Sequence, residues 1–233
     1  MGPAHRRVDL NADLGEGVTD DEGLLGLVTS ANVACGFHAG DEATMRAVCA
    51  TAVRRGVVVG AQVSYDDREG FGRRRMDVAY DVLRGQVAEQ VATLGRIAEE
   101  AGTAVGYLKP HGALYNRVVD DEEQARAVLD GSGDLPVLGL PDSVVLRLAR
   151  ADGRRVVPEG FPDRGYTAEG RLVPRGQPGA LVEEPDQVAR NAVRLAADVD
   201  SVCVHGDSPG AVETARRVRA ALVGAGFEVV AWG

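Results

Sequence analysis

One lysine stands out among the basic residues of this chain. Lys109 is the only lysine among 26 lysines and arginines, and it lies two residues before His111 in the stretch YLKPHGALYN. An ammonium can approach an oxyanion as a point charge and can change its pKa on burial, whereas a guanidinium binds through a planar fork and stays protonated. We therefore predict a catalytic or substrate-binding role for Lys109; the alternative is a buried ion pair with an acidic residue.

Other polar residues that can do chemistry come directly at or after apolar, strand-like runs. In chain order they are Asp9, Asn11, Asp13 and Glu16; Asn32, His38 and Asp41; Gln62 and Ser64; Lys109 and His111; Glu159, Asp163 and Arg164; and His205 and Asp207. In parallel α/β proteins the carboxyl ends of the strands meet on one face, where substrate sites are built. Six strand ends with such residues predict a single polar pocket.

The elements that must position these residues alternate along the chain. Strands are expected at Arg7–Ala12, Ala31–Cys35, Val57–Val63, Ala104–Lys109, Leu135–Leu140, Arg155–Glu159, Ser201–His205 and Phe227–Trp232. Helices are expected at Asp21–Val28, Asp41–Arg55, Asp77–Ala101, Asp121–Leu129, Asp142–Ala151, Asp186–Asp198 and Ala211–Gly224. This alternation predicts an α/β fold with a parallel sheet, first as a closed or nearly closed βα barrel of seven or eight strands and second as an open doubly wound sheet.

The chain is predicted to form one domain, residues 1–233, because it shows no repeat or linker and can bury one core. Phe161–Gly179, rich in glycine, proline and charge, is predicted to be a long loop with a hairpin over one end of the barrel. A net charge of −9 argues against a nucleic-acid surface, and no apolar run is long enough to span a membrane. Three widely spaced cysteines without a CxxC motif indicate a reducing cytoplasm.

Several of these residues also have simpler interpretations. Asp41 and Asp207 precede helices and could be N-caps. Cys35, three residues before His38, is interpreted as a buried thiol rather than a nucleophile. The run Arg73–Arg75 could bind an anion or form a solvated turn. No P-loop or GxGxxG motif is present, so the sequence shows no standard nucleotide-binding loop.

Two kinds of chemistry remain open from the residues alone. Three histidines with several carboxylates could hold a divalent metal, but no HxxH, HxxxH or HExxH motif places two imidazoles on one element, and no metal ligand is assigned. Acid–base chemistry needs only a carboxylate, a histidine and a cation for the developing negative charge. We take acid–base chemistry on a small substrate as the main interpretation.

With these residues assembled, the chain resembles the LamB/YcsF family, which is associated with the A subunit of the prokaryotic 5-oxoprolinase. The matching blocks run from residue 9 to residue 211 and read DLNADLGEG, ANVACGFHAGD, GFGRR, LKPHGALYN, DRGYTAEGRLVPRGQPGA and CVHGDSPGA. The resemblance implies a distorted βα barrel related to polysaccharide deacetylase-like folds. It also implies ATP-dependent hydrolysis of 5-oxoproline (pyroglutamate) to L-glutamate, with ATP as cosubstrate and two partner subunits.

For this reaction we expect Asp9 or Asp13 to act with His111 as the acid–base set and Lys109 to stabilise the oxyanion or a phosphoryl oxygen. Arg164 or Arg175 is expected to hold the substrate carboxylate. The other expected substrate-binding residues are Asn11, His38, Gln62, Glu159, Asp163, His205 and Asp207.

The chain departs from the family pattern at one position. Members usually read GAHPSYPD where this chain reads GAQVSYDD, so Gln62 replaces a histidine. A glutamine can hydrogen-bond a substrate, but it does not transfer protons at neutral pH and is a poor metal ligand. Two alternatives to the main interpretation are a stand-alone metal-dependent deacetylase or amidohydrolase, and a non-catalytic ligand-binding subunit.

Overall fold

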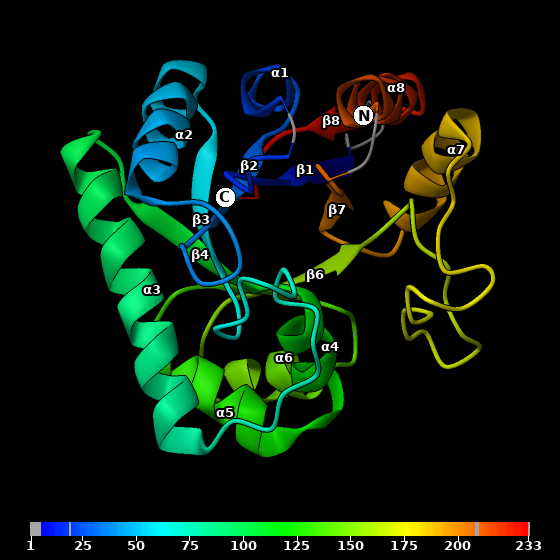
Figure 1. Ribbon diagram of the computed structural model, residues 1–233. Coiled ribbons are helices and arrows are strands. Elements are labelled where there is room, and N and C mark those ends of the chain that lie inside the picture. Colours follow the sequence, from blue (N-terminus) through cyan, green and yellow to red (C-terminus); the bar gives the residue numbers. More distant parts are fainter. Residues whose placement is uncertain (1–5, 19, 208–209, 233) are drawn as a thin grey trace.

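A computed structural model describes residues 6–18, 20–207 and 210–232 (Figure 1). Strands and helices alternate through these residues. Their order is β1 (Arg6–Leu14), α1 (Asp21–Leu25), β2 (Ser30–Ala34), α2 (Glu42–Arg55), β3 (Val58–Val63), α3 (Tyr80–Glu100), β4 (Val105–Pro110), α4 (Gly112–Asp120), α5 (Glu122–Gly131), β5 (Val137–Gly139), α6 (Val144–Ala151), β6 (Val156–Gly160), α7 (Pro185–Leu195), β7 (Ser201–Val204), α8 (Ala211–Gly224) and β8 (Phe227–Val229).

The strands form a closed parallel barrel. Strands β1 to β7 pair in chain order, and β7 pairs back with β1, so seven strands close the ring. The extra strand β8 pairs with the first part of β1, from Arg6 to Val8. The predicted barrel is confirmed, and the open doubly wound sheet does not form. The prediction that residues 1–233 are one domain stays a prediction.

The apolar core lies between the barrel and the surrounding helices, which Figure 1 shows on the outside of the strands. Along β1, Val8, Leu10, Ala12 and Leu14 belong to this core. The alternate side chains of a strand point to the opposite face. The intervening polar residues of β1 therefore point into the barrel, as the Asp-Asn-Asp alternation predicts.

Local signals in the sequence set several helix ends. Asp41 accepts a hydrogen bond from the Thr44 amide at 2.8 Å, so its N-cap interpretation is correct. Gly56 ends α2 with φ of 67°, a conformation that glycine adopts without strain. The expected helix from Asp77 begins at Tyr80, and the expected helix from Asp21 ends at Leu25.

One helix was not predicted. Helix α4 starts directly after His111, in a stretch where Pro110 and Gly112 indicate a break rather than a helix. Its buried residues, Leu114, Tyr115, Val118 and Val119, follow the spacing of three and four residues typical of a helix.

Within the described residues, no helix is long and apolar enough to cross a lipid bilayer.

The predicted hairpin after β6 is present. Tyr166 pairs with Leu172 in an antiparallel bridge, and Arg164 pairs with Leu181. The guanidinium of Arg164 donates to the carbonyl oxygens of Val173 at 2.8 Å and Ala180 at 3.1 Å, so this side chain braces the hairpin from within.

Candidate functional site

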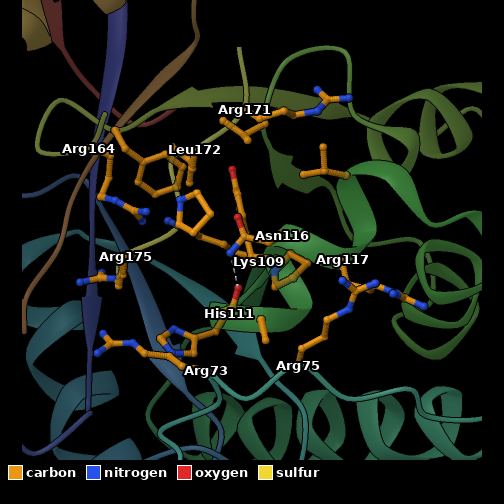
Figure 2. Close-up of a pocket in the computed structure, with 18 of the residues that line it drawn as sticks. Arg73, Arg75, Lys109, His111, Asn116, Arg117, Arg164, Arg171, Leu172 and Arg175 are labelled. Atoms are coloured by element: carbon orange, nitrogen blue, oxygen red, sulfur yellow. Dashed lines mark hydrogen bonds between the residues drawn. The ribbon is translucent and has the colours of Figure 1, made fainter. Parts of the chain in front are cut away.

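A cavity of about 600 Å³ opens at the carboxyl ends of the strands. Asp13, Lys109, Phe161 and His205 line it from the ends of β1, β4, β6 and β7. Arginines also line it, as Figure 2 shows. They are Arg73, Arg75, Arg117, Arg164, Arg171 and Arg175. A cavity with this charge suits a small anionic ligand in a chain whose net charge is −9.

Lys109 is held at the floor of the cavity by a cage of acceptors. Its Nζ lies 2.9 Å from Glu159 Oε2, 3.1 Å from Asn11 Oδ1 and 3.6 Å from Asp13 Oδ1. The sulfur of Cys203 is also 3.1 Å away. Burial opposes the positive charge, but the sulfur of Cys203 and the carboxylates of Glu159 and Asp13 raise the pKa of Lys109 well above its ordinary value. These contacts favour the ammonium form, so the structure favours the use of Lys109 as a point charge over its use as a base.

A second layer of polar residues inside the barrel supports this cage. Asn11 donates to Ser201 Oγ at 2.7 Å and accepts from Asn32 at 2.7 Å. Asn32 accepts in turn from the hydroxyl of Tyr107 at 2.6 Å. The ring of Tyr107 lies over Gly60, where a Cβ atom would come within 2.1 Å of it. These bonds fix the side-chain oxygen of Asn11 toward Lys109.

Asp9 lies in this deeper layer and does not line the cavity. Its carboxylate accepts hydrogen bonds from Thr29 at 2.6 Å, from Ser30 at 2.7 Å and from Ser201. Burial raises the pKa of Asp9 despite these hydroxyl donors. The structure thus gives Asp9 a supporting position, whereas Asp13 reaches the cavity.

A compact cluster joins the loops after β1 and β2 to the ends of β3 and β4. The Oε1 atom of Glu16 lies 3.4 Å from His38 Nε2 and 3.6 Å from His111 Nδ1. The two imidazole rings stack with centroids 4.0 Å apart. Gln62 donates from Nε2 to Glu16 at 3.1 Å and faces His111 Nδ1 at 2.9 Å. Among the described residues, Glu16, His38 and His111 are the group whose ligand atoms converge as a metal site requires.

A glycine-containing loop packs onto these two rings. Gly72 has φ of 67°, and a Cβ atom there would lie 2.9 Å from His38 Cβ and 3.0 Å from His111 Cδ2. The preceding residue, Phe71, accepts a hydrogen bond from His111 Nε2 at 3.1 Å and contacts both imidazoles edge-on. The loop can approach this closely only because residue 72 lacks a side chain.

A third histidine, His205, lines the cavity from the end of β7. Its Nδ1 lies 2.8 Å from Asp163 Oδ2, and its ring stacks on Phe161 with centroids 5.3 Å apart. Burial would raise the pKa of Asp163, but the charge and hydrogen bonds of His205 lower it. The carboxylate orients the imidazole, and Nε2 has no hydrogen-bond partner among the described residues. This is the arrangement of a general base held by an acid.

The structure separates the predicted site residues into two groups. Six of them line the cavity: Asp13, Lys109, His111, Arg164, Arg175 and His205. The others do not line the cavity: Asp9, Asn11, His38, Gln62, Glu159, Asp163 and Asp207. Asp207 binds Arg73 and lies 3.9 Å from Arg175, so it holds two of the arginines that line the cavity. Arg164 is engaged with backbone carbonyls, as described above.

Several cavity residues were not predicted from the sequence. Tyr115 and Asn116 belong to α4, whose helix was not predicted, and Arg117 and Arg171 carry no signal of their own in an arginine-rich chain. Glu16 was noted at a strand end but not assigned to the site. Cys35 is buried and donates to the Val33 carbonyl at 3.2 Å, in agreement with the buried-thiol interpretation.

Comparison with known proteins agrees with this architecture. The model of the LamB/YcsF family matches residues 8–233. A protein of Streptomyces avermitilis, named as the A subunit of 5-oxoprolinase, is 56% identical over 97% of this chain and 99% of the relative. A protein of Mycobacterium avium with the same name is 50% identical, over 97% of this chain and 98% of the relative. The chain belongs to the LamB/YcsF family.

Solved structures support the same conclusion for the fold. The crystal structure of a lactam utilization protein from Thermus thermophilus superposes with a TM-score of 0.90 at 37% identity, over 97% of this chain and 100% of that chain. The Bc1960 peptidoglycan N-acetylglucosamine deacetylase superposes with a TM-score of 0.55 at 15% identity, over 98% and 87%. The second likeness concerns the fold alone and confirms the predicted deacetylase-like barrel.

Proposed function

We propose that this member of the LamB/YcsF family is the A subunit of a 5-oxoprolinase, which opens the lactam of 5-oxoproline to L-glutamate with ATP as cosubstrate and two partner subunits. The observation that carries the proposal is the ammonium of Lys109, held by Glu159 in a cavity that arginines also line. The names of the similar proteins, which refer to 5-oxoprolinase and to lactam utilization, support the choice of substrate.

The proposed reaction needs the charges that the cavity offers. Ring opening forms a bond between a water oxygen and the lactam carbon, breaks the ring C–N bond and moves a proton from water to the ring nitrogen. Negative charge develops on the carbonyl oxygen, and a fixed cation stabilises it. Phosphorylation of that oxygen by ATP, with release of ADP, would make the carbon more electrophilic and would add charge of the same sign. Ring opening by water would then leave an acyl phosphate, from which a second water would release phosphate to give glutamate. Both forms of the substrate also carry a carboxylate, for which guanidinium groups are suited.

We assign the roles from the contacts of each side chain. Lys109 stabilises the oxyanion or the phosphoryl oxygen. His205, oriented by Asp163 through Nδ1, takes the proton from the attacking water, because it lines the cavity and its Nε2 has no partner among the described residues. Arg175 holds the substrate carboxylate, and Arg164 keeps the hairpin in place.

The acid–base pair expected from the sequence, His111 with Asp13, remains the second candidate. Their closest atoms, His111 Nδ1 and Asp13 Oδ2, are 4.0 Å apart. Both nitrogens of His111 already have partners, Gln62 and the Phe71 carbonyl. For this reason we favour His205 as the proton acceptor.

Reconstitution with the proposed partner subunits tests the function. We expect glutamate to be released from 5-oxoproline, with ADP, only when ATP and all subunits are present. Absence of glutamate from the full mixture would refute the assignment. Hydrolysis of acetylated or cyclic amides by the chain with metal and without partners would favour the stand-alone amidohydrolase. Calorimetric binding of 5-oxoproline without turnover in the full mixture would favour a ligand-binding subunit.

We further propose that the protein works in a reducing compartment such as the cytoplasm. Cys35, Cys49 and Cys203 are all free and buried, which supports this placement.

A further inference from the structure

We propose that Glu16, His38 and His111 form a binding site for one divalent transition-metal cation, with Zn²⁺ as the best match. We further propose that the carboxamide of Gln62 takes up the lone pairs of these ligands when no cation is bound. The inference rests on the contacts of four buried side chains and does not depend on the identity of the substrate.

The three ligand groups come from separate parts of the chain and meet at one point. One ligand atom from each residue lies within 4.8 Å of the others, and all three side chains are buried. One carboxylate oxygen with two imidazole nitrogens is a ligand set typical of zinc in proteins. Asp13, whose Oδ2 lies 4.0 Å from His111 Nδ1, supplies a further negative charge near the cation.

The hydrogen bond on the far side of His38 orients its free nitrogen toward Glu16. The hydroxyl of Ser64 donates to the Tyr65 carbonyl at 2.9 Å, so it can only accept from His38 Nδ1, 3.0 Å away. The proton of the neutral ring is therefore on Nδ1. The lone pair of His38 is on Nε2, which faces Glu16.

The same logic applies to His111. Its Nε2 lies 3.1 Å from the Phe71 carbonyl oxygen, which can only accept, so Nε2 carries the proton. The lone pair is then on Nδ1, which faces Glu16 and Gln62. Metal-binding histidines usually donate their second ring nitrogen to a carbonyl or another acceptor in this way. Two histidines that follow different strands, β2 and β4, are both prepared as ligands at one point.

Two acceptors face one another in this arrangement. His38 Nε2 and Glu16 Oε1 are 3.4 Å apart, and each offers a lone pair. Gln62 donates one amide proton to Glu16 and the other to His111, so it supplies no proton between His38 and Glu16. A cation between His38 and Glu16 resolves this opposition, because both atoms then act as ligands.

The contacts of Gln62 are further evidence for a cation site here. Its Oε1 atom is buried without a hydrogen-bond partner among the described residues, while its Nε2 occupies the lone pairs of Glu16 and His111. Rotating the carboxamide of Gln62 by half a turn exchanges its Oε1 and Nε2 atoms. The oxygen can then bind the cation, and the lone pairs of Glu16 and His111 become free to do the same. Because a carboxamide is a weaker ligand than an imidazole, we infer that Gln62 weakens cation binding in this chain.

Titration of the metal-free chain with Co²⁺ and Zn²⁺ tests this inference. We expect one Co²⁺ per chain, seen by its visible absorption, and its displacement by Zn²⁺ in competition with a chromophoric chelator. Glu16→Gln and His38→Ala should each weaken Zn²⁺ binding at least 100-fold, and Gln62→His should strengthen it at least tenfold. His205→Ala is the matched control, because this cavity histidine lies outside the triad and its loss should leave Zn²⁺ affinity unchanged.

Circular dichroism of every variant shows whether it is folded, and the near-isosteric Glu16→Gln serves if His38→Ala does not fold. Equal Zn²⁺ affinity in the wild type and in Glu16→Gln would overturn the proposal. Failure of both the wild type and Gln62→His to bind either cation would also overturn it, and would indicate that a proton joins His38 to Glu16 instead.

Discussion

The ammonium nitrogen of Lys109 lies 2.9 Å from a carboxylate oxygen of Glu159, and both side chains are almost fully removed from water. A buried pair of opposite charges is costly to desolvate and is held only where further polar groups satisfy it. Asn11 and Asp13 supply those groups. Lys109 also lines the cavity. It therefore fits both interpretations at once, as one half of a buried ion pair and as a cation that a ligand can reach.

Replacing Lys109 should abolish the proposed activity. We expect Lys109→Ala and Lys109→Arg to lower ATP-dependent glutamate release by about 100-fold or more, because the first removes the cation and the second cannot fit a guanidinium into its cage. The exposed charge-conserving substitution Arg96→Lys should leave release unchanged. Near-full release with either Lys109 variant would contradict the assignment.

Loss of the ammonium should also lower stability. Lys109→Ala leaves Glu159 charged and buried, at a cost of about 3–5 kcal/mol in the free energy of unfolding. The double variant Lys109→Met with Glu159→Gln removes both charges and should recover most of that loss while remaining inactive. This comparison separates the catalytic effect from the effect on folding.

The contact between Asp163 and His205 should make stability depend on pH. The folded-state pKa of Asp163 lies below 3.8, so ionised Asp163 adds stability above that pH and loses it as the pH falls through the lowered value. We expect Asp163→Asn to reduce the free energy of unfolding by about 1–3 kcal/mol at about pH 6, and by less at about pH 3. Urea titrations at both pH values measure this, with the exposed Asp81→Asn as control. An equal loss at both pH values would show that the charge of Asp163 is not involved.

Gly72 should tolerate no side chain. We expect Gly72→Ala to lower the free energy of unfolding by about 1–3 kcal/mol, because its φ is positive and its Cβ would press on His38 and His111. Gly85 in α3 is the matched control, since a Cβ there meets no atom within 4 Å; Gly85→Ala should stabilise by up to about 1 kcal/mol. If Gly72→Ala had the same melting temperature as the wild type, this result would contradict the close packing of the loop.

The cysteines should be inert in the folded protein. Burial raises the pKa of Cys35 to about 12 and that of Cys49 to about 11, and it raises the pKa of Cys203 well above its ordinary value. Because the thiolate is the reactive form, we expect a thiol-specific reagent to modify none of the three in the native chain and all three in denaturant. Rapid modification of Cys35 in the native chain would restore its interpretation as a nucleophile.

Much of the fold could be predicted from local patterns. The alternation of apolar runs and amphipathic segments identified all eight strands, and Asp41 marked the start of a helix through its N-cap chemistry. Helix α4 could not be predicted in this way. Pro110 and Gly112 signal a break locally, whereas burial of Leu114 and Val118 against the core stabilises the helix that follows.

The parallel barrel, the gathering of polar residues at the strand ends and the special position of Lys109 could be predicted, because they depend on composition and periodicity. Which of these groups meet depends on the way the chain folds in three dimensions. Asp9 and Asp13 look alike in the sequence, yet closure of the barrel buries one among hydroxyl groups and brings the other to the cavity. Likewise, His205 contacts Asp163, which is 42 residues away in the sequence, and Gln62 contacts Glu16, which is 46 residues away. Such pairings follow from strand register and loop packing, which join residues distant in sequence and leave no local signal.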